Sequence, residues 1–196
     1  MTRACLALTT LAIATGVAGA APLNLVPGRP DVHSAFITVA YDFPTSTLTA
    51  NGFADQLALN FVDPAINLSS PLRAFTLSAV INHDGTFTGV GSLSVSGNYG
   101  GPNTLLFSGA SLSQFGFNGS ALEFVFSNTG GSLDPFGGDV GVILSDPAFT
   151  FPGFGASFNN VSAGEDARSD TFLIPAPGAA AFGLGAAGMF ARRRRR

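Results

Sequence analysis

Short runs in which apolar and polar residues alternate recur along most of this 196-residue chain. Successive side chains of a β-strand point to opposite faces of a sheet, so a period of two predicts strands with one buried face. Helical spacing over about ten residues or more is confined to the two ends of the chain. The clearest alternating runs lie at 37–43, 57–61, 75–79, 92–96 and 122–126.

Turn-forming residues separate these runs at intervals of roughly 8 to 15 residues, a spacing typical of β-sandwiches and barrels. Asp84 and Gly85 are expected to close a hairpin between residues 75–81 and 86–95, because Asp-Gly supplies the positive φ of a tight turn. Further strands are expected at 105–117, at 140–144 and, with an interruption, at 148–158.

These strands predict an all-β body over residues 21–173. We expect an antiparallel two-sheet β-sandwich of about eight to ten strands, followed by a flexible stretch after Asn159. Phenylalanine is expected to fill the core, because the chain has 19 Phe, two Tyr and no Trp, and pairs such as Phe124 and Phe126 share one face of a strand. The alternative, an exposed stacking platform for sugars or bases, would favour Trp and Tyr.

The first 20 residues have the features of a secretory signal peptide. Arg3 gives a short positive start, an apolar run extends from residue 4 to about residue 17, and the small residues Ala18 and Ala20 fit a cleavage site. The apolar run is shorter than the ~20 residues that cross a bilayer, so we expect cleavage rather than a membrane anchor. Cleavage would remove Cys5, the single cysteine, and leave the body without a thiol.

The other end of the chain, residues 174–196, also has the features of a targeting segment. Thirteen small or apolar residues, 179–191, follow a proline motif and precede a basic block. As a helix they would rise only ~20 Å, against a hydrocarbon core of ~30 Å, so snorkelling arginines or local thinning would have to help. The positive-inside rule would hold the basic block in the cytoplasm. The motif and the block consist of Pro175, Ala176, Pro177 and Gly178, and of Arg192, Arg193, Arg194, Arg195 and Arg196.

This arrangement resembles the PEP-CTERM sorting signal, which is recognised by an exosortase, a membrane-embedded cysteine protease or transpeptidase. The resemblance covers residues 175–196 and is strengthened by the signal peptide at the other end; Ala176 stands where the family most often has Glu. It implies export by the Sec machinery, transient anchoring in the inner membrane and processing by an exosortase. It also implies that the body is passed to the cell surface or the extracellular matrix.

The body offers few groups for catalysis or for a cofactor. Histidine occurs only at His33 and His83, whereas a zinc site needs three or four ligands at suitable spacing, so no metal or cofactor is expected. Asp134 and Asp139 are a weak candidate for Ca²⁺, with plain turn structure as the alternative. Nucleic acid is not an expected partner, because the body's basic residues are few against twelve acids. These basic residues are Arg29, Arg73 and Arg168.

Together these patterns predict an exported surface or matrix protein with a structural or adhesive role and no enzymatic activity. The first alternative is a carbohydrate-binding module with exopolysaccharide as its partner. A concave face with exposed Tyr, Asn and Asp would favour that alternative, and flat faces covered by Ser and Thr would speak against it. The second alternative is a hydrolase, which needs two carboxyl groups that face each other about 5–9.5 Å apart.

Overall fold

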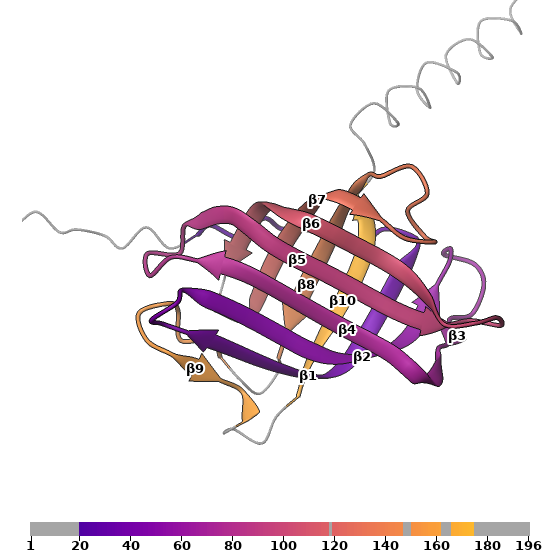
Figure 1. The fold of residues 1–196 in the computed structure, drawn as a ribbon, viewed down its shortest axis with the longest axis horizontal. Helices are drawn as coiled ribbons and strands as arrows, with labels where there is room; N and C mark the ends of the chain where they lie inside the picture. Colours follow the sequence, from indigo (N-terminus) through magenta and orange to yellow (C-terminus); the bar gives the residue numbers. More distant parts are fainter. Residues whose placement is uncertain (1–19, 118, 147–149, 162–165, 175–196) are drawn as a thin grey trace, which may run out of the picture.

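Each long strand pairs with the strand that follows it along the chain. The computed structural model describes residues 20–117, 119–146, 150–161 and 166–174. Eight long antiparallel strands and two short ones lie in these residues (Figure 1). The long strands are β1 (Asp31–Asp42), β2 (Thr47–Ala58), β4 (Ser69–Ile81), β5 (Phe87–Asn98), β6 (Thr104–Phe117), β7 (Ala121–Gly130), β8 (Asp139–Ser145) and β10 (Ala167–Ile174), and the short ones are β3 (Ile66–Asn67) and β9 (Phe158–Asn159).

The last long strand returns to the first and closes the sheet. β10 pairs with β1 in antiparallel register, from Asp31 opposite Phe172 to Ile37 opposite Ala167, and β1 also pairs with β2 along its whole length. The structure is therefore a closed eight-stranded antiparallel β-barrel, and the expected two-sheet sandwich is wrong. Because every long strand lies beside its neighbour in sequence, no strand crosses from one sheet to another.

The closing strand β10 is the element that the sequence pattern missed. Residues 167–174 belong to the stretch after Asn159 for which flexibility was expected. The alternate residues that β10 buries are Ala167, Ser169 and Thr171, which are small or polar and give no alternating apolar signal. Its large aromatic residue, Phe172, is buried on the other face of the strand, where it contacts Gly28 and Gly141. Without β10 the remaining strands suggested two open sheets.

Phenylalanine fills the barrel as predicted. Phe75, Phe107, Phe124 and Phe126 are fully buried, and an eight-stranded barrel has an interior that side chains can just fill. Glycine makes room where strands bend closely over these rings: a Cβ on Gly109 would lie 2.5 Å from the Cβ of Phe126. Local register shifts in several strand pairs, including β4–β5 and β6–β7, supply further bending.

The connection between β8 and β10 closes one end of the barrel, which we call the plug end; here β1 finishes at Asp42 and β2 begins at Thr47. Phe154, from this connection, is 5% exposed and packs its ring 5.0 Å from Tyr41 and 5.6 Å from Phe115. The expected strand at 148–158 is wrong for the described residues 150–158, which form this plug and only the start of β9.

Asn160 fixes the plug to β1. Its side chain is fully buried, accepts a hydrogen bond from the Val39 amide at 2.8 Å and donates one to the Ile37 carbonyl at 3.0 Å. β9 then pairs with β1 at Ala40 and Tyr41, where Figure 1 shows it beside the end of that strand. These bonds satisfy the edge of β1 beyond the point where β10 begins.

Residues 20–30 form a strap along the outer wall. The buried carboxylate of Glu123 on β7 accepts hydrogen bonds from the backbone amides of Leu23, Asn24 and Leu25, at 2.6, 3.0 and 3.0 Å. The strap then reaches β10, where it covers Phe172, and leads into β1. Ala20, at the expected signal cleavage site, packs against the core, whereas Ala18 and the sorting motif at 175–178 lie outside the described residues.

Among residues 20–117, 119–146, 150–161 and 166–174, no helix is long and apolar enough to span a membrane.

Candidate functional site

A β-bulge interrupts β1 where it pairs with β10. The register moves from Ser34 opposite Ser169 to Ile37 opposite Ala167, so Ala35 and Phe36 together face Arg168. Phe36 has a φ of 54°, in the left-handed region that bulky residues rarely adopt, and its side chain is 62% exposed. The bulge therefore presents an aromatic ring on the outer wall, at the seam between the first and last strands.

A depression of about 480 Å³ lies at this seam. Its volume falls within the range of about 300–1,000 Å³ typical of small-molecule sites. Its lining mixes charged, amide and hydroxyl groups with the ring of Phe36. We call it the seam depression, and its lining residues are His33, Ser34, Ala35, Phe36, Asp55, Gln56, Ser145, Arg168, Ser169 and Asp170.

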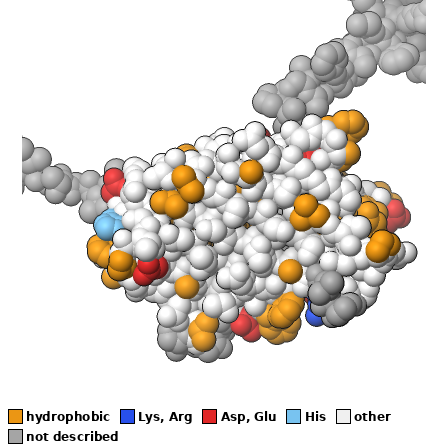
Figure 2. Space-filling model, in the orientation of Figure 1, with side chains coloured by type: hydrophobic (Ala, Val, Ile, Leu, Met, Phe, Trp, Pro, Cys, Tyr) orange, Lys and Arg blue, Asp and Glu red, His pale blue; other side chains and the backbone are white. Residues whose placement is uncertain are grey.

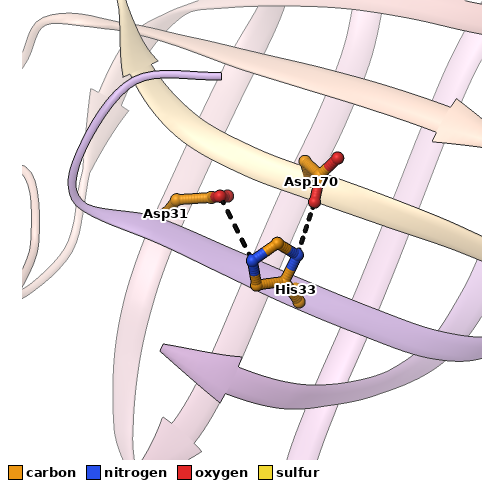
Figure 3. A group of neighbouring side chains, drawn as sticks. All are labelled: Asp31, His33 and Asp170. Carbon is orange, nitrogen blue, oxygen red and sulfur yellow. Dashed lines mark ion pairs between the residues drawn. The ribbon is translucent and has the colours of Figure 1, made fainter. Parts of the chain in front are cut away.

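His33 joins two carboxylates beside the depression (Figure 3). Its Nδ1 lies 2.5 Å from Oδ1 of Asp170 on β10, and its Nε2 lies 3.4 Å from Oδ2 of Asp31 on β1. Asp31 is 1% exposed, and its Oδ2 also accepts a hydrogen bond from Nη1 of Arg29 at 2.7 Å. Asp31 and His33 are two residues apart and share one face of β1, while the strand pairing places Asp170 directly opposite His33.

The pKa values of Asp31 and His33 are both raised above their ordinary values. Burial raises the pKa of Asp31 from 3.8 to about 6, although the charges of His33 and Arg29 oppose the rise. The hydrogen bond to Asp170 raises the pKa of His33 above its ordinary value, with burial opposing it. His33 therefore takes up a proton more readily than a free histidine does, and in its protonated form it bridges the two carboxylates.

One ligand atom from each of the three side chains lies within 4.8 Å of the others, which is close enough for a shared metal ion. The two carboxylates, however, approach different nitrogens of the same imidazole ring (Figure 3). A cation would also compete with the guanidinium of Arg29 for Asp31. The arrangement fits a protonated imidazole between two carboxylates better than it fits a metal ion.

All three arginines of the body gather around this part of the wall. Arg29 pairs with Asp31, and Arg73 pairs with Asp55 at 3.1 Å. Arg168 lines the depression and is exposed, and it has no ion-pair partner in the part of the chain that the structure describes. This gathering was not predictable from the sequence, because the three residues are far apart along the chain.

Two serines at the seam turn their side chains inward, behind the depression. Ser34 and Ser169 are opposite each other across the seam and are 2% and 3% exposed. Their hydroxyl oxygens are buried and have no hydrogen-bond partner among the described residues. Such unpaired buried groups lower stability at the seam.

The candidate calcium ligands lie elsewhere, between β7 and β8. Asp134 is buried, its Oδ1 accepts a hydrogen bond from the Gly138 amide at 2.9 Å, and its Oδ2 contacts the hydroxyl of Thr129. Asp139 is exposed at the start of β8. The carboxylate of Asp134 is thus engaged by its own turn, which is the plain structural alternative.

Sequence reasoning did not assemble the seam site. His33 was set aside as an isolated histidine, and Asp31 and Asp170 were only two of twelve acids. The i, i+2 spacing of Asp31 and His33 was the one available signal. It places the two side chains on one face only if a strand begins at Asp31. Comparisons with protein-family models, with curated proteins and with solved structures found no match.

Proposed function

We propose that this chain is an exported, non-enzymatic protein that is sorted to the cell surface or the extracellular matrix and has a structural or adhesive role there. The observation that carries the proposal is the position of the signal peptide and of the C-terminal sorting segment relative to the barrel. β10 ends at Ile174, directly before Pro175, and the strap begins next to Ala20. Removal of the signal peptide and of the sorting segment would therefore take no strand from the barrel.

The outer wall supports a role that depends on surface contacts. The barrel interior is filled by buried side chains, so partners must meet the outside. On β4 and β5 the outward residues pair Thr76 with Ser94 and Ser78 with Ser92, and the face seen in Figure 2 is mostly uncharged. Such a hydroxyl-covered face speaks against a dedicated saccharide site on β4 and β5, and it suits broad contact with a hydrated matrix.

The signal peptide and the sorting segment indicate which machinery would export and process the chain. The Sec machinery would export the chain, residues 174–196 would hold it transiently in the inner membrane, and an exosortase would act at the proline motif. The exported body would keep its three arginines against twelve acids. This charge favours solubility outside the cell and disfavours adsorption to nucleic acid.

Tail processing can be tested in a host that has an exosortase. An epitope inserted between Gly100 and Gly101, where added atoms meet nothing within 4 Å, would report the location of the chain. We expect the wild type at the cell surface or in the matrix, with a C-terminus that lacks the arginine block by mass spectrometry. The double change Pro175→Ala and Pro177→Ala should leave the chain in the inner membrane with the block intact.

Pro102→Ala, at an exposed proline in the same loop as the epitope, is the matched control and should be processed normally. The same location and the same C-terminus for wild type and double variant would contradict the proposal.

A second candidate function, saccharide binding, is favoured by the seam depression, which is concave and carries an exposed aromatic ring. The hydrolase alternative gains a pair of facing carboxylates in Asp31 and Asp170. Asp31, however, is buried beneath Arg29 and does not line the depression, so a substrate there would meet only one of the two.

A further inference from the structure

One cation of the seam depression takes part in no ion pair among the described residues. Three carboxylates that line the depression or lie beside it have a basic partner: Asp31 has Arg29, Asp55 has Arg73, and Asp170 has His33 when the imidazole is protonated. Arg168 is the cation that remains, exposed in the lining. A planar guanidinium binds a carboxylate through two parallel hydrogen bonds, so an anionic group is the natural complement of this lining.

The ring of Phe36 stands at the edge of the same depression. It is 62% exposed, and the left-handed backbone that presents it would suit glycine or asparagine better than phenylalanine. Strained residues of this kind persist where the surrounding structure enforces them, and they concentrate at ligand sites. An exposed aromatic face complements the C–H face of a sugar ring, which is apolar although its edge carries hydroxyls.

Further groups for hydrogen bonds flank His33, on the strands that pair with β1. The amide of Gln56 and the carboxylate of Asp170 both line the depression, and the second oxygen of Asp170 points away from His33 (Figure 3). An amide both donates and accepts hydrogen bonds, whereas a carboxylate accepts them, so the pair suits neighbouring hydroxyl groups.

We propose that the seam depression binds an acidic saccharide, with the carboxylate of a uronic-acid unit on Arg168, ring hydroxyls on Gln56 and Asp170, and the C–H face of a sugar ring against Phe36. A neutral saccharide would leave Arg168 unused, and an acidic peptide would lack the array of ring hydroxyls. The inference rests on the proposed function, since it names the chemical class of the matrix partner and the place where the barrel meets it.

The test uses the full chain, purified in a polyoxyethylene detergent that contains no sugar, and isothermal titration at low salt. Trigalacturonic acid should bind at least about tenfold more tightly than neutral galactotriose, because charge-assisted hydrogen bonds give the larger share of the affinity. Triglutamate, which has the same number of side-chain carboxylates but no sugar ring, should bind as weakly as the neutral trisaccharide.

Two variants locate the site. Arg168→Gln should weaken binding of trigalacturonic acid about tenfold or more, and Phe36→Asn, which tolerates the backbone of the bulge, should weaken it about two- to tenfold. Gln114→Glu is the matched control for charge: it also makes the chain more negative by one unit, but on β6, across the barrel from β1. It should leave the affinity unchanged.

Undetectable binding of trigalacturonic acid, equal binding of galactotriose or triglutamate, or equal affinity of both site variants and the wild type would overturn the proposal. Circular dichroism of each variant establishes that it is folded. If Arg168→Gln does not fold, Phe36→Asn and the comparison of ligands still decide the question. Export and tail processing are measured separately in cells, so a failure of saccharide binding is distinguishable from a failure of the proposed function.

Discussion

Truncation of Phe154 tests whether the connection between β8 and β10 closes the barrel. This residue is 5% exposed, and its ring contacts aromatic residues of β1, β6 and β9, namely Tyr41, Phe115, Phe117 and Phe158 at centroid distances of 5.0 to 6.1 Å. Replacement of a buried Phe by Ala costs about 3–5 kcal/mol, because the transfer energy of the ring is lost and a cavity remains. A domain has only about 5–15 kcal/mol in total, so the loss is a large fraction of it.

The assay is urea unfolding followed by far-ultraviolet circular dichroism, with a thermal scan beside it. Phe154→Ala should lower the free energy of unfolding by about 3–5 kcal/mol, which for a body of this size is roughly 10 °C in melting temperature. The near-ultraviolet signal of Tyr41 should also weaken, since the chain has two Tyr and no Trp to mask it. Phe136→Ala, at a ring that is 97% exposed, is the control and should change stability by less than about 0.5 kcal/mol. Equal changes in the free energy of unfolding for Phe154→Ala and Phe136→Ala would refute the conclusion that Phe154 closes this end of the barrel.

Three further perturbations have expected outcomes. Burial raises the pKa of Asp31 from 3.8 to about 6, so folding takes up a proton between these pH values and stability falls as pH rises. The free energy of unfolding of the wild type, relative to that of Asp31→Asn, should fall by ~3 kcal/mol from about pH 3 to pH 7 in urea titrations, and a rise would contradict this. Glu123→Ala should expose the amides of residues 23–25 to hydrogen exchange, whereas Glu123→Gln keeps an acceptor and should protect them better; equal exchange in both would count against the strap. Gly131→Ala should cost at least about 1 kcal/mol more than Gly100→Ala, since both have positive φ but only the first places a Cβ 2.3 Å from the Leu106 carbonyl; equal melting temperatures would exclude that clash.

The local part of the fold was predictable from the sequence. The Asp84–Gly85 turn forms as expected, with a φ of 83° at Gly85 and with Ile81 opposite Phe87 in the hairpin. β7 was recognised because the apolar residues Leu122, Phe124 and Phe126 alternate along the chain, and all three are fully buried. The expectation of one exposed face is wrong for this strand, because Glu123, which binds the strap, and Val125 are buried on its other side. In these cases the structure depends on a few neighbouring residues, namely on the alternation of apolar residues along a strand and on the residues of a turn.

Closure of the barrel was not predictable in this way. It depends on a pairing between β1 and β10, from opposite ends of the body, and β10 buries small and polar residues instead of an apolar face. The same pairing creates the candidate site, because it brings Asp170 to His33 and Arg168 to the bulge at Phe36. Because β10 was missed, neither the closed barrel nor the cluster of Asp31, His33 and Asp170 was predicted.

The pairing of β1 with β10 is the central claim, since both the barrel and the seam site depend on it. Nuclear Overhauser contacts between backbone protons of the two strands, measured on the isotope-labelled chain, test it most directly. We predict contacts for the pairs Asp31–Phe172, His33–Asp170 and Ser34–Ser169, with slow hydrogen exchange along β10. Absence of these contacts, together with rapidly exchanging amides at residues 167–174, would show an open sheet with a free C-terminal stretch and would contradict the account.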